Sequence, residues 1–260
     1  MLTEQIRVHD NFGTGAHVPR RKISVYLPPG YNENTERRYP VLYMHDGQNL
    51  FDPATSVGGV PWAADEAAQM AILEGRVEPL IIVGIDHGGV DRIKEYTPVK
   101  TDFGKMRGHG GGADRYGRMI IDELKPFIDS EYRTKPEREF TGMGGSSLGG
   151  LVTIYLGIRH PQVFSRLAVI SPSAWWAKNH IIRETAKLGE RIPLRIWLDI
   201  GKREGSTIKH QVRALKEMLL ANGWQNGEDL AYFEIPDATH NEVAWGERFG
   251  SVLTFLYPVM

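Results

Sequence analysis

Short apolar runs alternate with longer amphipathic stretches along the whole chain. Residues 39–44, 80–85 and 167–170 are almost continuously apolar, which is typical of strands buried on both faces of a parallel sheet. Longer stretches such as 62–73 carry apolar residues three and four positions apart, as one face of a helix does. Polar loops rich in Gly, Pro and Asn separate the two kinds of segment. This order favours a sheet whose strands are connected by helices.

The pattern predicts individual elements. The predicted strands are Ile6–His9, Ile23–Leu27, Tyr39–Met44, Leu80–Ile85, Arg138–Gly142, Leu167–Ile170, Leu194–Ile200 and Tyr232–Ile235. The predicted helices are Trp62–Leu73, Asp114–Ile128, Gly150–Arg159, a short one at Ile181–Leu188, one capped by Ser206 and a closing one from near Val243. Pro126 is expected to strain the last turn of its helix, because proline lacks an N–H. With no repeat or linker, residues 1–260 are predicted to form a single α/β domain, a mostly parallel sheet with helices on both faces.

Glycines surround one serine at the junction of a predicted strand and a predicted helix. Gly145-Ser146-Ser147-Leu148-Gly149 matches G-x-S-x-G, with Ser147 as the central serine. In a nucleophile elbow this serine lies in a strained turn that raises its hydroxyl above the sheet edge, and small neighbours avoid a Cβ collision. The next N–H, that of Leu148, then faces the substrate oxyanion. The alternative is a glycine turn that only packs a helix on a strand, but the flanking patterns favour the nucleophile.

Two more loops after predicted strands carry residues suited to catalysis. His45–Asp52 lies where an α/β hydrolase places its second oxyanion donor, and the N–H of Gln48 or Gly47 is the candidate. The alternative is an ordinary turn in which His45 and Asp46 are structural. His240 lies between the last strand and the closing helix, where the general base belongs, and would take the proton of Ser147.

The composition of the chain mainly excludes classes of function. The chain has 260 residues, a net charge of -1 and no cysteine, which excludes a thiol nucleophile and any Cys-ligated metal. Dispersed Lys and Arg leave no basic face for nucleic acid or membrane, and no run approaches the ~20 apolar residues of a membrane span. Without an H-E-x-x-H motif we expect neither a metal nor a cofactor. Met1–Arg7 has no leader pattern, so we expect a soluble cytoplasmic protein.

Five stretches together resemble one group of enzymes. They are YPVLYMHDGQNLFD at 39–52, GIDHGGVDRIKEYTP at 84–98, GGSSLGG at 144–150, DIGKREG at 199–205 and THNEVAWGER at 239–248. The chain resembles the esterase family of α/β hydrolases that includes enterochelin-esterase-like proteins, esterase D, feruloyl-esterase domains and mycolyltransferases. The resemblance implies a lid-poor α/β hydrolase with Ser147 as nucleophile and His240 as base. It also supports the region of Gln48 as an oxyanion donor.

The resemblance also points to an acid. Family members often carry a carboxylate three residues after the glycine that ends the preceding strand, and Glu204 has that position here, although many relatives have aspartate there. Asp199 lies within the strand itself and is the structural alternative. Asp237 is close enough to His240 in sequence to contact it. We therefore expect a Ser-His-Glu triad with these two aspartates as open alternatives.

The leading interpretation is a serine carboxylesterase that acts on small-molecule short-acyl or arylacyl esters through an acyl-enzyme. Acyl transfer to an alcohol on the same triad, or a non-catalytic binding role on this fold, are the alternatives. Trp175 and Trp176 follow a strand end and either line the substrate pocket or cover core. The connection 171–194 is too short for an enclosing cap, so we expect an open cleft with a minimal lid. The physiological substrate and the oligomeric state stay open at this point.

Overall fold

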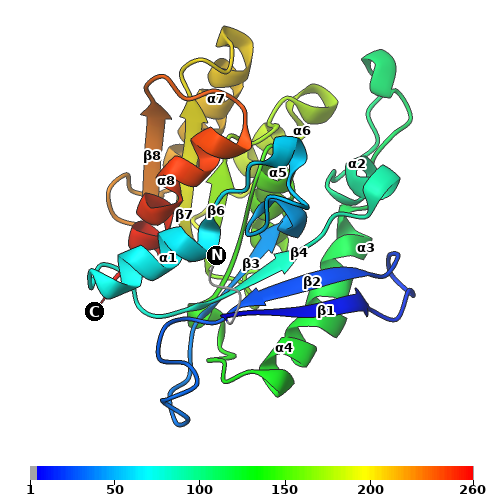
Figure 1. Cartoon of the computed structure of the whole chain (residues 1–260). Coiled ribbons are helices and arrows are strands. Elements are labelled where there is room, and N and C mark those ends of the chain that lie inside the picture. The colour runs from blue at the N-terminus through cyan, green and yellow to red at the C-terminus, as the bar shows by residue number, and fades with distance from the viewer. Residues whose placement is uncertain (1–4, 260) are drawn as a thin grey trace.

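One eight-stranded sheet organises the protein, as the computed structural model of residues 5–259 shows (Figure 1). The strand order is β1-β2-β4-β3-β5-β6-β7-β8. The strands are β1 Ile6–Phe12, β2 Arg21–Tyr26, β3 Val41–His45, β4 Ile81–Ile85, β5 Thr141–Ser146, β6 Arg166–Ile170, β7 Arg195–Gly201 and β8 Leu230–Ile235. From β4 to β8 all neighbours are parallel, whereas β1 and β2 add an antiparallel edge. The α/β prediction with a mostly parallel sheet is confirmed.

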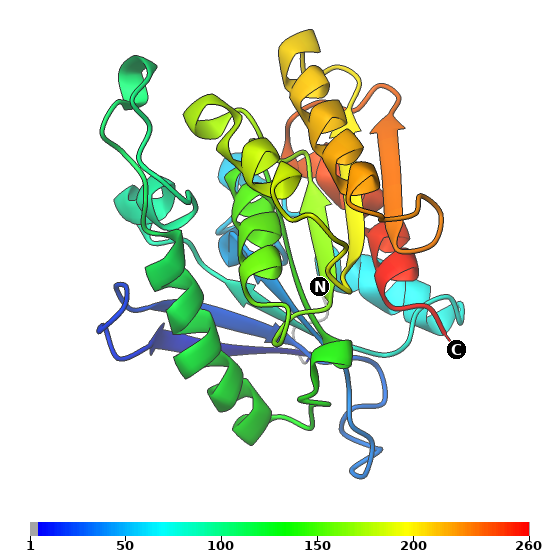
Figure 2. The ribbon, with the colours of Figure 1, turned by 180° about the vertical axis from the view of Figure 1, so that it is seen from behind.

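Helices cover both faces of this sheet. They are α1 Ala64–Leu73, α2 Arg92–Glu95, α3 Ala113–Arg118, α4 Lys125–Glu131, α5 Leu148–Arg159, α6 Trp176–Ala186, α7 Ser206–Ala221 and α8 Glu242–Leu256. Figures 1 and 2 show α1 and α8 on one face and the helices from α3 to α7 on the other. The buried apolar side chains accordingly form two clusters, one on each side of the sheet. Every residue of β3, β4 and β5 is buried, which explains why the sequence runs there are continuously apolar or glycine-rich.

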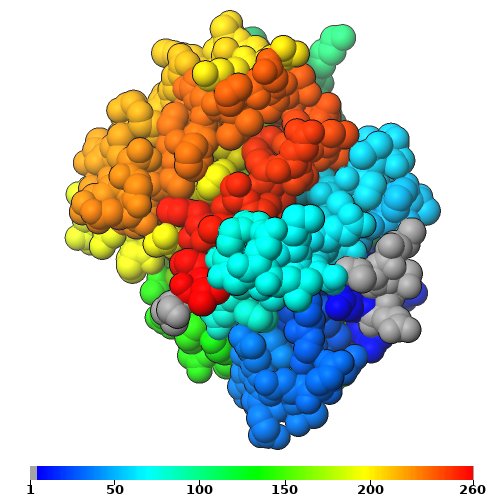
Figure 3. All heavy atoms as spheres, turned by 60° about the vertical axis from the view of Figure 1, so that its left-hand side comes forward, coloured from blue at the N-terminus to red at the C-terminus, as the bar shows by residue number. Residues whose placement is uncertain are grey.

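The face that carries α1 and α8 is not covered completely. Figure 3 shows a hollow between β8 and α8, which corresponds to a cavity of about 750 Å³. Trp197 and Phe233 stack there with ring centroids 4.7 Å apart, and Phe255 of α8 lies 6.2 Å from Trp197. This hollow lies on the sheet face opposite α5 and α7, at the edge strand.

Three local predictions differ from the structure. Residues 138–140 form a 3-10 turn, and the predicted strand begins only at Thr141. The helix at 113–131 continues through Pro126 to Glu131, and a π-helical segment, Met119–Leu124, directly precedes this part of it. Ser206 does not cap α7: the cap is Gly205, whose φ of 93° suits a residue without a Cβ.

In the part of the chain that the structure describes, none of the helices has the length and the apolar composition that crossing a membrane requires. The expectation about a leader segment at Met1–Arg7 falls largely on residues 1–4, which lie outside the described range.

Candidate active site

Ser147 occupies the turn between β5 and α5 in a strained backbone conformation. Its φ of 58° and ψ of -119° are rarely adopted by residues with a Cβ, and such strain persists only where packing enforces it. A Cβ at Gly145 would lie 3.1 Å from the backbone of Gly149, and one at Gly150 would lie 2.9 Å from the carbonyl oxygen of Ile170. The small residues therefore allow the close turn that the motif predicts.

His240 stands beside this serine. Its Nε2 is 2.9 Å from Ser147 Oγ, and its Nδ1 is 2.6 Å from Glu204 Oε2. A carboxylate has no proton to give, so Nδ1 carries the hydrogen and Nε2 accepts from the serine hydroxyl. The edge of Trp245 meets the imidazole at 84° with ring centroids 4.9 Å apart, which restricts the orientation of the ring.

The Glu204 carboxylate is fully enclosed, with a side-chain exposure of 0%. Burial raises its pKa, but hydrogen bonds from His240, from Ser171 Oγ at 2.6 Å and from the Gly201 N–H at 2.9 Å outweigh this, so its pKa lies below the ordinary range. Glu204 is therefore an anion at neutral pH, positioned to stabilise an imidazolium.

The other two candidate acids lie elsewhere. Asp199 is fully buried and receives two hydrogen bonds from the Arg248 guanidinium, at 2.9 and 3.0 Å. Asp237 is exposed and forms an ion pair with Arg203 at 2.5 Å. Of the three carboxylates that the sequence offers, the structure brings Glu204 to His240.

The two residues predicted to donate to an oxyanion each have a backbone N–H without a partner in residues 5–259. Leu148 is the first residue of α5 and Gln48 is in the 3-10 turn Gly47–Asn49, and neither N–H has an acceptor among the described residues. The loop of Gln48 lies against the elbow, because a Cβ at Gly149 would be 3.3 Å from the Cβ of His45. Gly47 is required in that turn, since a Cβ there would be 2.5 Å from the backbone of Gly84.

His45 and Asp46 have structural partners. Burial, together with the charge of Arg92, lowers the pKa of His45 to about 3, and its Nδ1 lies 2.8 Å from the hydroxyl of Tyr116. Asp46 has a φ of 56° and binds the guanidinium of Arg92 through both oxygens, each at 2.7 Å. Both side chains therefore have structural contacts beside the turn Gly47–Asn49.

The tryptophans that follow β6 differ from each other. Trp175 is 40% exposed, whereas Trp176 is 1% exposed and its indole N–H donates to the carbonyl of Val99. Trp176 is thus a core residue, and its predicted place in the substrate pocket is wrong: the turn through Ser173 points it inward. Of the two indoles, that of Trp175 is the exposed one.

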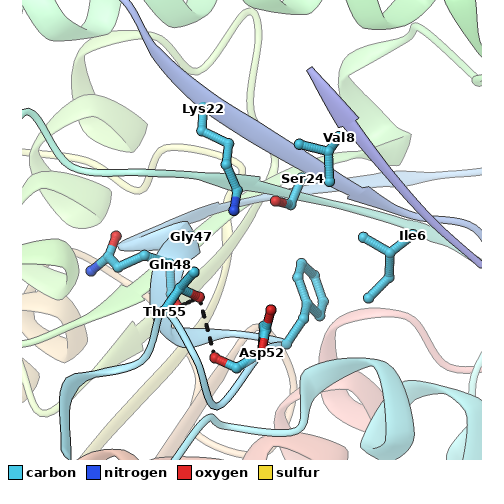
Figure 4. A pocket seen from close by; sticks show the side chains of 9 residues that line it. Ile6, Val8, Lys22, Ser24, Gly47, Gln48, Asp52 and Thr55 are labelled. Carbon is cyan, nitrogen blue, oxygen red and sulfur yellow. Dashed lines mark hydrogen bonds between the residues drawn. The ribbon is translucent and has the colours of Figure 1, made fainter. Parts of the chain in front are cut away.

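A cavity of about 180 Å³ adjoins the turn Gly47–Asn49. Figure 4 shows Lys22 and Ser24 of β2 and Val8 of β1 facing Gln48, Asp52 and Thr55 across it. The hydroxyl of Thr55 donates to the Gln48 carbonyl at 2.7 Å and holds this wall. The cavity is small, mixed in polarity and next to a proposed oxyanion donor.

Some residues near the nucleophile were not anticipated. Ser173 Oγ lies 3.3 Å from Ser147 Oγ, and Ser171, at the end of β6, contacts Glu204. Arg248 lies one turn after Trp245 on α8 and faces the same region. In the sequence, the three-residue spacing of Trp245 and Arg248 indicates that both lie on one face of a helix. Their contacts with Ser171 and Asp199, on other elements, are visible only in the folded chain.

Residues 17–256 match the family described as Putative esterase. The chain belongs to this family. It is therefore a member of a family of esterases, which are carboxylic ester hydrolases. The family match covers the serine, the histidine and the glutamate described above.

The relatives agree with this assignment. The chain is 27% identical to the protein YbbA of Bacillus subtilis over 91% of its length and 92% of that protein. It is 28% identical to the ferri-bacillibactin esterase BesA of Bacillus subtilis over 56% of its length, and spans 52% of BesA. Among solved structures, an IroE-like serine hydrolase from Shewanella oneidensis superposes with a TM-score of 0.79 and 23% identity, over 97% of this chain and 80% of that one. This last likeness shows the fold.

Proposed function

We propose that the protein is a serine carboxylesterase with Ser147, His240 and Glu204 as its catalytic triad. The observation that carries the proposal is the continuous hydrogen-bond path from Ser147 Oγ through both nitrogens of His240 to Glu204. The serine lies in a strained turn and the carboxylate is enclosed, so both ends of the path are held in place.

The first half of the reaction transfers the acyl group to the enzyme. Ser147 Oγ attacks the ester carbonyl while His240 Nε2 takes its proton, and Glu204 stabilises the resulting imidazolium. The carbonyl oxygen becomes an oxyanion that the N–H groups of Leu148 and Gln48 are proposed to bind. Collapse of the tetrahedral intermediate breaks the bond to the alcohol, which leaves with the proton from His240.

The second half of the reaction hydrolyses the acyl-enzyme and regenerates the free enzyme. The side chain of His240 is 38% exposed, so a water molecule can reach its Nε2 from solvent. His240 removes a proton from this water, which attacks the acyl carbonyl, and Ser147 recovers its proton as the acid departs.

The proposed substrates are small esters with a short acyl or an arylacyl group. The exposed Trp175 beside the elbow offers an aromatic contact, and the short connection 171–194 leaves the site open. A relative named for ferri-bacillibactin makes siderophore esters one class to test.

Active-site labelling tests the proposal. A fluorophosphonate probe should label the purified wild-type protein on Ser147, and p-nitrophenyl acetate should be hydrolysed. Ser147→Ala should abolish labelling and lower kcat by a factor of about 10⁴ or more, with an unchanged thermal melt. Ser146→Ala is the neighbouring control and should still be labelled. Labelling that persists in Ser147→Ala, or ester product that appears only with an added alcohol, contradicts the proposal.

A further inference from the structure

A buried polar network adjoins Glu204 at Oε1, the carboxylate oxygen that His240 does not contact. Its members come from three elements: Ser171 at the end of β6, Asp199 in β7, and Trp245 and Arg248 in α8. All four are at most 6% exposed. Burying charges is costly unless they are paired and hydrogen-bonded, so the contacts within the network decide what it can do.

The proton of Ser171 has only one destination. Ser171 Oγ lies 2.6 Å from Glu204 Oε1, 2.9 Å from Arg248 Nη2 and 3.2 Å from Trp245 Nε1. Guanidinium and indole nitrogens donate but cannot accept. The hydroxyl must therefore accept from Arg248 and Trp245 and donate to Glu204.

Arg248 is itself held in one orientation. Its Nε and Nη2 bind both oxygens of Asp199, at 2.9 and 3.0 Å, and its Nη1 donates to the carbonyl of Ala244. Asp199 also accepts from the indole of Trp197 at 2.7 Å and from the Ser171 N–H at 3.1 Å. The ion pair is thus saturated with hydrogen bonds, as a buried pair must be.

We propose that Arg248, Asp199 and Ser171 are positioning residues, which orient the Glu204 carboxylate and set the proton affinity of His240. This proposal rests on the proposed function, since it gives the triad acid a supporting group. Ser171 links Arg248 to the carboxylate. Because Arg248 donates to the Ser171 hydroxyl, this hydroxyl donates to Glu204 Oε1, and Oε2 stays available for His240. Trp245 joins both parts, because its N–H binds Ser171 while its ring edge restricts the imidazole.

The proposal predicts opposite pH effects for the two charges. Removing the cation in Arg248→Gln should favour imidazolium and move the acidic limb of kcat/KM to higher pH. Removing the anion in Asp199→Asn should move the limb to lower pH, each by on the order of half a unit or more. The other charged groups nearby include two ion pairs, Arg203 with Asp237 and Arg92 with Asp46. Glu242 accepts a hydrogen bond from the amide of Asn49 and keeps its charge, which is the same in the wild type and in both variants.

Ser171→Gly tests the link itself. Ser171 has a φ of 41°, which glycine adopts without strain, so the backbone should tolerate the change while the hydroxyl is lost. We expect kcat for p-nitrophenyl acetate to fall about tenfold or more with KM within twofold, because Glu204 loses a charge-assisted hydrogen bond. The matched control is Glu95→Gln in the other buried ion pair, Arg21–Glu95, which should cost stability but leave the acidic limb unmoved.

The outcomes separate this inference from the proposed function. If Ser171→Gly keeps wild-type kcat, or if both charge variants leave the limb where it is, the network is structural only and the inference is wrong. Either result counts only if the folded wild-type enzyme hydrolyses the ester in a Ser147-dependent way. If the wild type neither hydrolyses esters nor reacts with a fluorophosphonate, the proposed function itself is wrong.

Discussion

At the scale of single residues, several side chains near the elbow have a strained backbone or are buried at a cost in free energy. Ser147 and Ser171 both have positive φ values, at 58° and 41°, and they lie on neighbouring strand ends. His45, buried at the end of β3, is kept neutral by its surroundings. Each arrangement costs free energy that the core must offset.

Stability should fall as the pH is lowered because of His45. Its pKa is about 3 in the folded protein and 6.5 ordinarily, so between these values the unfolded chain binds the proton and the folded chain does not. The free energy of unfolding should therefore decrease as pH falls from 6.5, by up to about 1.4 kcal/mol per pH unit from this group. Urea unfolding of wild type and His45→Gln at pH 7, 6 and 5 measures it. Identical slopes for the two proteins would contradict the assignment.

The three carboxylates should differ in their effect on catalysis. Glu204→Gln removes the anion that contacts His240 and should lower kcat by a factor of about 10³–10⁴. Asp199→Asn should cost less, because it acts through Arg248 and Ser171. Asp237→Asn, on an exposed ion pair, should leave kcat within twofold. A loss for Asp237→Asn that equals that of Glu204→Gln would transfer the role of acid.

At the scale of elements, the connection from β6 to β7 decides what can cover the site. It holds α6 and an unusual left-handed run, Ala177–Asn179, just after Trp176. Lys178 of that run binds Asp102 at 2.8 Å, which connects it to the loop before α3. We predict that this segment forms one wall beside the elbow and does not extend over it as a cap.

Ester length should report on this wall. For p-nitrophenyl esters from acetate to palmitate, kcat/KM should be highest at acetyl to butyryl, without a jump at the micellar threshold. Trp175→Ala should raise KM for an arylacyl ester about fivefold through lost aromatic contact. Trp176→Ala is the contrasting variant and should lose about 3–5 kcal/mol of stability as a core truncation. A maximum at long chains would mean that the open-cleft argument is wrong.

At the scale of the whole molecule, the sheet brings distant parts of the sequence together. Ser147 follows β5, Glu204 follows β7 and His240 follows β8, and these strands are parallel, so their carboxyl ends share one edge. The antiparallel strand β2 is joined to helix α2 by the buried ion pair of Arg21 and Glu95.

That buried pair should matter more to stability than surface pairs do. Arg21→Met leaves Glu95, whose side chain is 3% exposed, without its cation, and should cost about 3–5 kcal/mol of unfolding free energy. Lys187→Ala removes an exposed partner of Glu184 and should give no measurable change. Urea titrations with a constant m-value compare the two. Equal losses would show that burial does not set the strength of these pairs.

Local sequence patterns were sufficient to predict the alternation of strands and helices, the elbow and the positions of serine and histidine. These follow from local rules: apolar periodicity for buried strands, and glycines where a Cβ would collide, as at Gly145 and Gly149. Helix ends were less accurate, since Gly205 and not Ser206 caps α7, and the π-helical segment before Pro126 leaves no clear pattern.

Which carboxylate meets His240, and which tryptophan is buried, became clear only from the folded chain. All three carboxylates lie near the end of a predicted strand, so this pattern alone does not rank them. Their partners come from other segments: Glu204 contacts His240, Asp199 contacts Arg248, and Asp237 contacts Arg203. Trp175 and Trp176 are adjacent and differ only in the direction that the turn after β6 gives them. The network beside Glu204 joins β6, β7 and α8, and no local pattern encodes contacts between residues 77 positions apart, such as Ser171 and Arg248. Such pairs form only when the sheet assembles, because the sheet places side by side strands that are far apart in the sequence.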